Sequence, residues 1–194
     1  MNFGRRTLAT GLVALAGALV ARQGRAARRK LGGRTGMTAH QFEFVSIDGE
    51  LMPMKQFAGK PVLVVNTASF CGFTPQYADL EAVWRNYKDR GLVVLGVPSN
   101  DFGQQEPGNA AEIKKFCETY DVSFPLSRKE TVVGPQAHPF YRWIAAELGE
   151  GGAPRWNFHK YLVDGAGRLV GAWPSTVKPT AGEITAALEE TLQS

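Results

Sequence analysis

Two short apolar runs, rich in valine and leucine, are the clearest pattern in the chain: residues 60–68 (KPVLVVNTA) and 92–98 (LVVLGVP). Continuous apolar runs of this length, with many β-branched residues, are typical of strands that are buried on both faces of a sheet. Between them, residues 75–90 place apolar side chains three or four positions apart, which predicts an amphipathic helix. Thr74 and Pro75 are expected to form its N-cap and its first residue.

Alternation of apolar and polar residues predicts two β-hairpins, over residues 40–54 and 158–173. Each contains an Asp-Gly pair, at 48–49 and 164–165, and the first pair predicts a type I′ turn. A short strand is expected near Phe124. The apolar spacing predicts three more helices: residues 108–120, 137–149 and 180–193.

The order of these elements predicts the fold. It begins with a hairpin, continues with a strand–helix–strand unit and an added helix, and ends with a strand–strand–helix unit. Strands joined through a helix run parallel, whereas strands joined by a tight turn run antiparallel, so the sheet is mixed. The sequence therefore predicts an α/β protein with a thioredoxin-like fold, in which helices flank a central mixed β-sheet and a β-hairpin precedes it.

The positive charge of the chain is concentrated in its first 36 residues. This segment holds eight of the 22 Lys and Arg residues and no Asp or Glu, whereas the remaining part has 14 basic and 18 acidic residues. The net charge of +4 therefore comes from the tail, and the rest of the chain carries a net charge of −4. Because the predicted globular part has no basic surplus, nucleic acid is not expected as a partner.

Residues 1–36 are predicted to be an export signal, followed by one domain over residues 37–194. Arg5 and Arg6 directly precede an apolar stretch of 15 residues, 7–21, which suggests a twin-arginine-type signal and a periplasmic location. The basic residues after this stretch are unusual for a cleavage region. An uncleaved membrane anchor and an organellar transit peptide therefore stay open as alternatives.

Cys71 is one of only two cysteines, and it lies where the first predicted strand meets the following helix. The unpaired N–H groups and the dipole of a helix N-terminus favour a negative charge there, and hence the nucleophilic thiolate. An inert, half-buried cysteine is the structural alternative. Thr74 stands where a C-x-x-C motif would have its second cysteine, so dithiol exchange of the thioredoxin kind is not expected.

Four sequence blocks resemble the glutathione peroxidase family: VNTASFCGFTPQYADLE, LGVPSNDFGQQEPG, EIKKFC and WNFHKYLVD. The resemblance spans residues 40–193 and implies a cysteine-type peroxidase that reduces hydrogen peroxide and organic or lipid hydroperoxides without a cofactor. By position in these blocks, Cys71 matches the family's peroxidatic residue, and Gln105, Trp156 and Asn157 match the rest of its catalytic tetrad. Their amide and indole N–H groups would hold the thiolate and stabilise charge as the O–O bond breaks. Taken singly, Trp156 is equally typical of a core aromatic residue and Gln105 of an ordinary loop residue.

The resemblance also implies a role for Cys117. In the thioredoxin-dependent branch of the family, a cysteine at this position resolves the cycle by attacking the sulfenic acid, here on Cys71. Thioredoxin or glutathione would then reduce the disulfide. If the two sulfur atoms start far apart, helix 108–120 has to loosen during the cycle. A buried free thiol and a permanent structural disulfide are the alternatives.

Two departures from common family patterns, and the length of one link, refine this expectation. Phe70 stands where many members carry Lys, which removes a positive charge beside Cys71. Ser99 stands where many members carry Cys, which leaves Cys117 as the candidate resolving thiol. The link over residues 150–154 is short, as in monomeric members with an open site, which favours bulky lipid hydroperoxides as substrates and thioredoxin as reductant.

The three histidines, His40, His138 and His159, lie far apart and show no metal-binding spacing, so no metal site is predicted. His159 follows Asn157 closely and either lines the site or is an ordinary strand residue. Two other functions would use the same fold. One is a redox sensor that passes oxidation to a partner protein, and the other is a binding module without catalysis. Peroxide-dependent turnover with thioredoxin would separate them.

Overall fold

The computed structural model describes residue 1, residues 33–149 and residues 151–193. Most of the predicted export signal, including Arg5 and Arg6, lies outside the described residues. In the part that is described, no helix is both long and apolar enough to cross a membrane.

Helices and strands follow one another in the predicted order. The strands are β1 (Glu43–Val45), β2 (Leu51–Pro53), β3 (Val62–Thr67), β4 (Val93–Pro98), β5 (Lys160–Val163) and β6 (Leu169–Trp173). The α-helices are α1 (Gln76–Tyr87), α2 (Ala110–Glu118), α3 (Pro139–Leu148) and α4 (Gly182–Leu192). Short 3-10 turns are η1 (Ala39–Gln41), η2 (Met54–Phe57) and η3 (Lys88–Arg90).

The central sheet has four strands in the order β4–β3–β5–β6. β3 is parallel to β4 and antiparallel to β5, and β5 is antiparallel to β6. Every residue of β3 and β4 is buried, as their continuous apolar runs predict. β1 and β2 form a separate two-stranded antiparallel sheet. The predicted thioredoxin-like α/β fold, with its mixed sheet and N-terminal hairpin, is confirmed.

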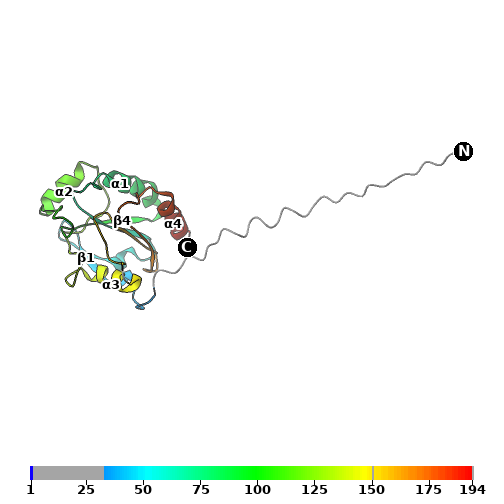
Figure 1. Cartoon of the computed structure of the whole chain (residues 1–194), viewed down its shortest axis with the longest axis horizontal. Coiled ribbons are helices and arrows are strands. Elements are labelled where there is room, and N and C mark those ends of the chain that lie inside the picture. Colours follow the sequence, from blue (N-terminus) through cyan, green and yellow to red (C-terminus); the bar gives the residue numbers. More distant parts are fainter. Residues whose placement is uncertain (2–32, 150, 194) are drawn as a thin grey trace.

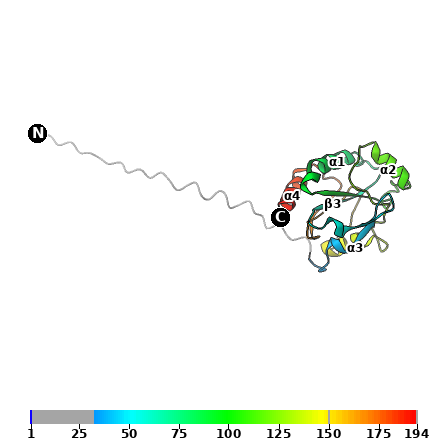
Figure 2. The ribbon, with the colours of Figure 1, turned by 180° about the vertical axis from the view of Figure 1, so that it is seen from behind.

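Helices cover both faces of the sheet (Figure 1). α1, α2 and α4 lie on one side and α3 and the hairpin on the other, and the reverse view in Figure 2 shows the same two layers. Residues of β3 alternate between the two cores, so Leu63 packs on the α1 side and Val64 on the α3 side. Cys71 and Cys117 both belong to the core on the α1 side.

The first hairpin does not contain the expected type I′ turn. Such a turn needs positive φ at both central residues, but Asp48 is not among the residues with positive φ, whereas Gly49 has a φ of 93°. Gly49 N–H donates to the Ser46 carbonyl (2.9 Å), and Ser46 N–H donates to the Glu50 carbonyl (2.7 Å). The chain therefore forms a type I turn followed by one left-handed glycine, a loop with one residue more than expected.

The strand expected near Phe124 is also wrong in extent. Among the described residues, this segment forms two isolated bridges, one between Leu126 and Gly96 of β4 and one between Ser127 and Ser46. Because Ser46 directly follows β1 and Gly96 lies in β4, the segment links the hairpin to the edge of the central sheet without becoming a strand of either.

Candidate active site

The turn between β3 and α1 presents Cys71 at the carboxyl end of the buried strand. Thr74, which was expected to cap α1, holds this turn together instead. Its Oγ1 accepts a hydrogen bond from Cys71 N–H (3.0 Å) and donates one to the Ala68 carbonyl (2.9 Å). Pro75 occupies the N-cap position, and no side chain caps the helix there. The prediction failed because the hydroxyl is already engaged within the turn.

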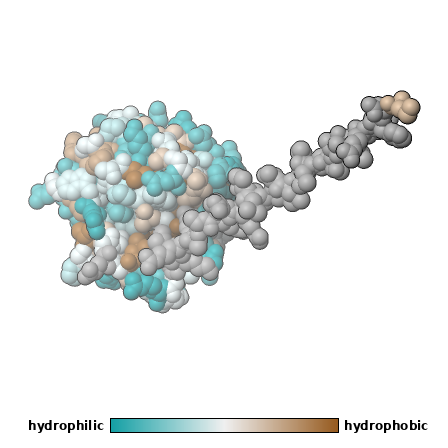
Figure 3. Space-filling model, turned by 45° about the vertical axis from the view of Figure 1, so that its right-hand side comes forward, coloured by the Kyte–Doolittle hydropathy of each residue, from teal (hydrophilic) through white to brown (hydrophobic). Residues whose placement is uncertain are grey.

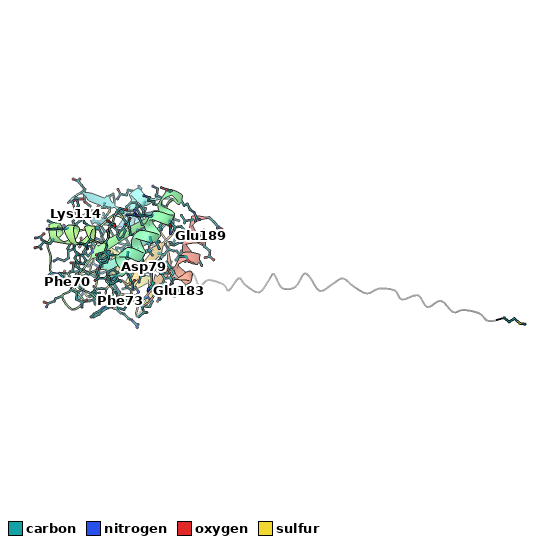
Figure 4. All side chains as sticks on the ribbon, turned by 90° about the horizontal axis from the view of Figure 1, so that it is seen from above. Phe70, Phe73, Asp79, Lys114, Glu183 and Glu189 are labelled. Carbon is teal, nitrogen blue, oxygen red and sulfur yellow. The ribbon has the colours of Figure 1, made fainter. Side chains whose placement is uncertain are left out.

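Cys71 is nearly buried, with 8% of its surface exposed. Its Sγ accepts a hydrogen bond from the Phe73 N–H, with an N···S distance of 3.4 Å. A backbone donor aimed at the sulfur suits a sulfur that carries negative charge. Phe70, directly before Cys71, is 66% exposed, and its ring lies 6.0 Å from that of Phe116 on α2. Figure 4 shows Phe70 on the same side of the molecule as Lys114 of α2.

Gln105 reaches the site from the loop that follows β4. Its carbonyl accepts a hydrogen bond from Phe70 N–H (3.0 Å), which fixes this loop beside the Cys71 turn. The side-chain Oε1 of Gln105 accepts a hydrogen bond from Asn157 Nδ2 (2.9 Å). Because Oε1 is used in this way, the donor end of the Gln105 amide, Nε2, is left for the site.

Trp156 and Asn157 come from the segment before β5. Asn66 in β3 holds this segment at three points: its Nδ2 donates to the Trp156 carbonyl (3.0 Å), its carbonyl accepts from Phe158 N–H (2.6 Å), and its N–H donates to the His159 carbonyl (3.3 Å). Asn157 is fully buried, whereas Trp156 is 39% exposed and its ring lies 5.8 Å from that of Phe102. Trp156 is thus partly open to solvent, unlike an ordinary core aromatic residue.

The structure brings three distant chain segments together at the ends of β3 and β4. Gln105 contacts both of the other segments, through Phe70 and through Asn157. The hydrogen bond to Cys71 Sγ found among the described residues comes from Phe73, and the side chains of Gln105, Trp156 and Asn157 donate none to it. Their proximity is therefore observed, and their catalytic roles stay predictions.

Sequence reasoning missed Asn66, which positions the Trp156 segment. The signal was present in the sequence: Asn66 is an amide that directly follows four apolar residues of the same strand, and it is fully buried. A buried amide needs hydrogen-bond partners, and here those partners are the backbone groups of the site.

Cys117 lies on α2 and is buried, with 2% of its surface exposed. Burial raises the pKa of its thiol to about 11. Both Cys71 and Cys117 are free thiols in this structure. Asn109 and Glu112 form a capping box at the start of α2, so the helix that carries Cys117 is well anchored at its N-terminus.

His159 is buried and stacks on Tyr161, with ring centroids 4.8 Å apart. Burial, together with Lys160 and Arg155, lowers its pKa to about 4, so the imidazole is neutral at physiological pH. His138 sits at the N-terminus of α3 and stacks on Phe44. No cluster of three or more metal-ligating side chains occurs within the described ranges.

Comparisons with known proteins agree with this architecture. Residues 39–145 match the family described as glutathione peroxidase. A hydroperoxy fatty acid reductase of Synechocystis sp. is 46% identical over 164 residues, which cover 80% of this chain and 96% of that protein. A glutathione peroxidase-like peroxiredoxin of Schizosaccharomyces pombe is 47% identical over 135 residues, covering 68% of this chain and 85% of that protein. The crystal structure of Trgpx in apo form has a TM-score of 0.67 at 35% identity, covering 81% of this chain and 97% of that one.

The fold and these relatives define a peroxidase that is built on a thioredoxin-like fold and works through a cysteine. The chain belongs to the glutathione peroxidase family, and it reduces hydroperoxides. The predicted family and the predicted enzyme class are thereby confirmed. The family match ends at residue 145, before Trp156 and Asn157.

Proposed function

We propose that Cys71 is the peroxidatic residue and that Gln105, Trp156 and Asn157 assist it. The observation that carries this proposal is the placement of Cys71. It lies on a buried turn, where a backbone N–H donates to its sulfur. The Gln105–Asn157 pair is hydrogen-bonded to the same turn through the Gln105 carbonyl. The thiolate attacks one oxygen of the hydroperoxide, the O–O bond breaks, and the other oxygen leaves with a proton as an alcohol or water. Cys71 becomes a sulfenic acid. Amide and indole N–H groups stabilise the negative charge on the departing oxygen.

Cys117 completes the cycle in this proposal. Its thiolate attacks the sulfenic sulfur of Cys71, a disulfide forms, and the sulfenic oxygen leaves as water. Because Cys117 is buried and its pKa is raised to about 11, the thiol is protonated in the packed helix. Loosening of α2 would expose the thiol, lower its pKa and bring it toward Cys71.

Thioredoxin is the proposed reductant, because its dithiol returns two electrons and two protons to the disulfide in one encounter. The relatives named as peroxiredoxins support a dithiol partner. Glutathione is the alternative donor.

The test compares steady-state peroxide turnover of the wild type, Cys71→Ser and Cys117→Ser, each with thioredoxin and with glutathione. Cys71→Ser is expected to be inactive with either donor. Cys117→Ser is expected to lose thioredoxin-dependent turnover while still reacting once with peroxide. Full thioredoxin-dependent turnover by Cys117→Ser would contradict the two-cysteine cycle, and activity of Cys71→Ser would contradict the whole assignment. A wild type that is oxidised once but does not turn over would indicate the redox-sensor function.

Fatty acid hydroperoxides are the proposed preferred substrates. Two Synechocystis relatives are named hydroperoxy fatty acid reductases. Beside the Cys71 turn lies a hollow of about 420 Å³. Its apolar lining, from Phe70, Pro107, Ile113 and Phe116, suits a hydrocarbon chain, and its other lining residues are Ser69, Glu106, Gly108 and Glu112. A fatty acid hydroperoxide should therefore have a higher kcat/KM than hydrogen peroxide. Equal values for the two substrates would count against this preference.

The protein is further proposed to be a monomer that is exported through its N-terminal segment. The face seen in Figure 3 carries small apolar patches among polar residues, which supports a monomer. Sedimentation at micromolar concentration tests the oligomeric state.

For export, residues 1–36 can be fused to a reporter that is active only outside the cytoplasm. Arg5→Lys with Arg6→Lys should abolish export of the fusion, and unchanged export would rule out the twin-arginine route.

A further inference from the structure

Lys160 is a fully buried lysine in β5 that the mechanism above does not use. Its Nζ donates hydrogen bonds to the carbonyls of Phe158 (2.7 Å) and Val177 (2.6 Å). None of the ion pairs between described residues includes it. Lysines are rarely buried to this extent, so these two bonds are its main compensation.

The chemistry around Lys160 shows that its burial is costly. Burial lowers the pKa of its ammonium to about 7, and Asp79 on α1 opposes this shift. Val65 of β3 and Trp173 of β6 flank it as neighbours in the sheet. A buried position between two strands ordinarily holds an apolar residue. The presence of a lysine there indicates that the hydrogen bonds of its amino group have a structural or functional role.

The first of its two partners is the residue that follows the Trp156–Asn157 pair. Phe158 is fully buried and has a left-handed φ of 63°. A bulky residue adopts this conformation only when its surroundings hold it there. Asn66 holds Phe158 from the N–H side (2.6 Å), and Lys160 holds it from the carbonyl side (2.7 Å).

The orientation of Phe158 sets the direction of the residues before it. Asn157 is the preceding residue, and its Nδ2 reaches Gln105 Oε1 at 2.9 Å. The Phe158 ring packs edge-on against Tyr77 of α1, with centroids 5.3 Å apart. A rotation of the Phe158 peptide would therefore move Asn157 away from Gln105.

We propose that Lys160 is a positioning residue for the peroxidase reaction: its bond to the Phe158 carbonyl maintains the left-handed turn that directs Asn157 toward Gln105 and the Cys71 turn. This inference rests on the proposed role of Asn157. Lys160 itself touches neither Cys71 nor the substrate in this account, and it acts through the backbone of Phe158.

The test is a double-mutant cycle of Lys160→Met and Asn157→Ala, made in the full chain with Cys117→Ser so that only the first chemical step is followed. The measured quantity is the rate constant of Cys71 oxidation by hydrogen peroxide. Lys160→Met should slow it by about 10- to 100-fold when Asn157 is present. In the Asn157→Ala background, Lys160→Met should cause little further loss, because the group that Lys160 positions is already absent. Lys88→Met, a matched change at an exposed lysine, should leave the rate unchanged.

A second readout separates positioning from general damage. Alkylation of Cys71 by iodoacetamide needs no stabilisation of a departing oxygen, so Lys160→Met should slow it far less than it slows oxidation. Equal losses in both reactions, or the same loss with and without Asn157, would overturn the proposal. Lys160→Gln, which keeps one donor group, should show an intermediate oxidation rate. If neither Lys160 variant folds, Lys160 is a structural residue and the proposal is wrong. Failure of the wild type itself to be oxidised at Cys71 would instead overturn the proposed function.

Discussion

Individual hydrogen bonds hold Cys71 in place. A reactive thiol needs a hydrogen-bond donor at its sulfur and a turn that holds it in place. The Phe73 N–H donates to the sulfur. The Thr74 hydroxyl accepts from the Cys71 N–H and donates to the Ala68 carbonyl, which holds the turn. The residue before Cys71 is the exposed, apolar Phe70, which brings no positive charge to the thiol. The backbone donors therefore carry more of the task of holding negative charge at this site.

Replacing Thr74 by valine should damage both the site and the fold. The Cys71 N–H and the Ala68 carbonyl would lose their partner inside a buried turn, which should lower the free energy of unfolding by about 1–3 kcal/mol. The oxidation rate of Cys71 should fall with it, because the turn that aims the Phe73 N–H would relax. Urea unfolding and single-turnover oxidation measure the two effects. Thr74→Ser keeps the hydroxyl and should behave like the wild type, and an equal loss in both variants would contradict this role.

The helix α2 has to meet two opposing requirements on its stability. It must fold well enough to bury Cys117, yet it must loosen if that thiol is to reach Cys71. Its N-terminus is closed by the Asn109–Glu112 capping box, and Lys114 forms an exposed ion pair with Asp48 in the hairpin turn (2.6 Å). An exposed pair of this kind contributes little, so the cap is the stronger restraint on the helix.

Removal of the cap should therefore speed up the resolving step. Asn109→Ala should destabilise α2 by about 1 kcal/mol, which corresponds to a disulfide that forms up to about fivefold faster. Oxidation of Cys71 should be unchanged. Rapid-quench measurement of free thiols after one equivalent of peroxide follows both steps. Lys115→Ala alters an exposed position of the same helix without touching the cap and serves as the control. A slower or unchanged resolving step in Asn109→Ala would contradict the loosening of α2.

In the whole molecule, one carboxylate on α3 binds residues 33–35, which lie just before the predicted domain. Glu147 on α3 accepts hydrogen bonds from the N–H groups of Gly33 (2.7 Å), Arg34 (2.8 Å) and Thr35 (3.0 Å), and also from the Thr35 hydroxyl. Burial alone would raise the pKa of Glu147, but these donors, with the Thr35 hydroxyl foremost, lower it to about 2. The segment that enters the domain is thus tied to α3 as long as Glu147 is ionised.

This anchor gives a pH dependence with a definite sign. A carboxyl whose pKa is lower in the folded state stabilises the fold above its unfolded pKa of 4.5, and this contribution is lost as the pH falls from 4.5 toward 2. Glu147→Gln should lower the free energy of unfolding by about 1–3 kcal/mol at neutral pH, and the difference from the wild type should shrink in that acidic window. Urea unfolding at neutral pH and within that acidic window measures this difference in the free energy of unfolding. Glu183→Gln, at an exposed position, is the control. A difference that does not change with pH would contradict the anchor.

Much of the fold could be predicted from the sequence because its signals are local. The apolar runs of β3 and β4 and the helical spacing of α1 each depend on neighbouring residues alone. One failure occurred where two local hydrogen-bonding patterns compete for the same side chain. Thr74 has the chemistry of a helix cap, but the Ala68 carbonyl and the Cys71 N–H engage it first.

The candidate site was predictable only in part. The proximity of Gln105 and Asn157, 52 residues apart, follows from no periodicity, and only the family resemblance placed them together. Asn66 and Lys160 were missed because both lie inside strands, where the sequence predicts burial but not which backbone groups a polar side chain meets. A polar residue within a fully buried strand is the signal that would have found them.

The peroxidatic role of Cys71 is tested most directly by locating the first oxidation. Cys117→Ser protein is treated with one equivalent of hydrogen peroxide, and intact and peptide masses are measured before any reductant is added. We expect that one oxygen atom is added and that it lies on Cys71, while Cys71→Ser protein with Cys117 intact gains none. Oxygen found on Cys117 in the Cys71→Ser protein, or an unmodified Cys71 in the first sample, would contradict it.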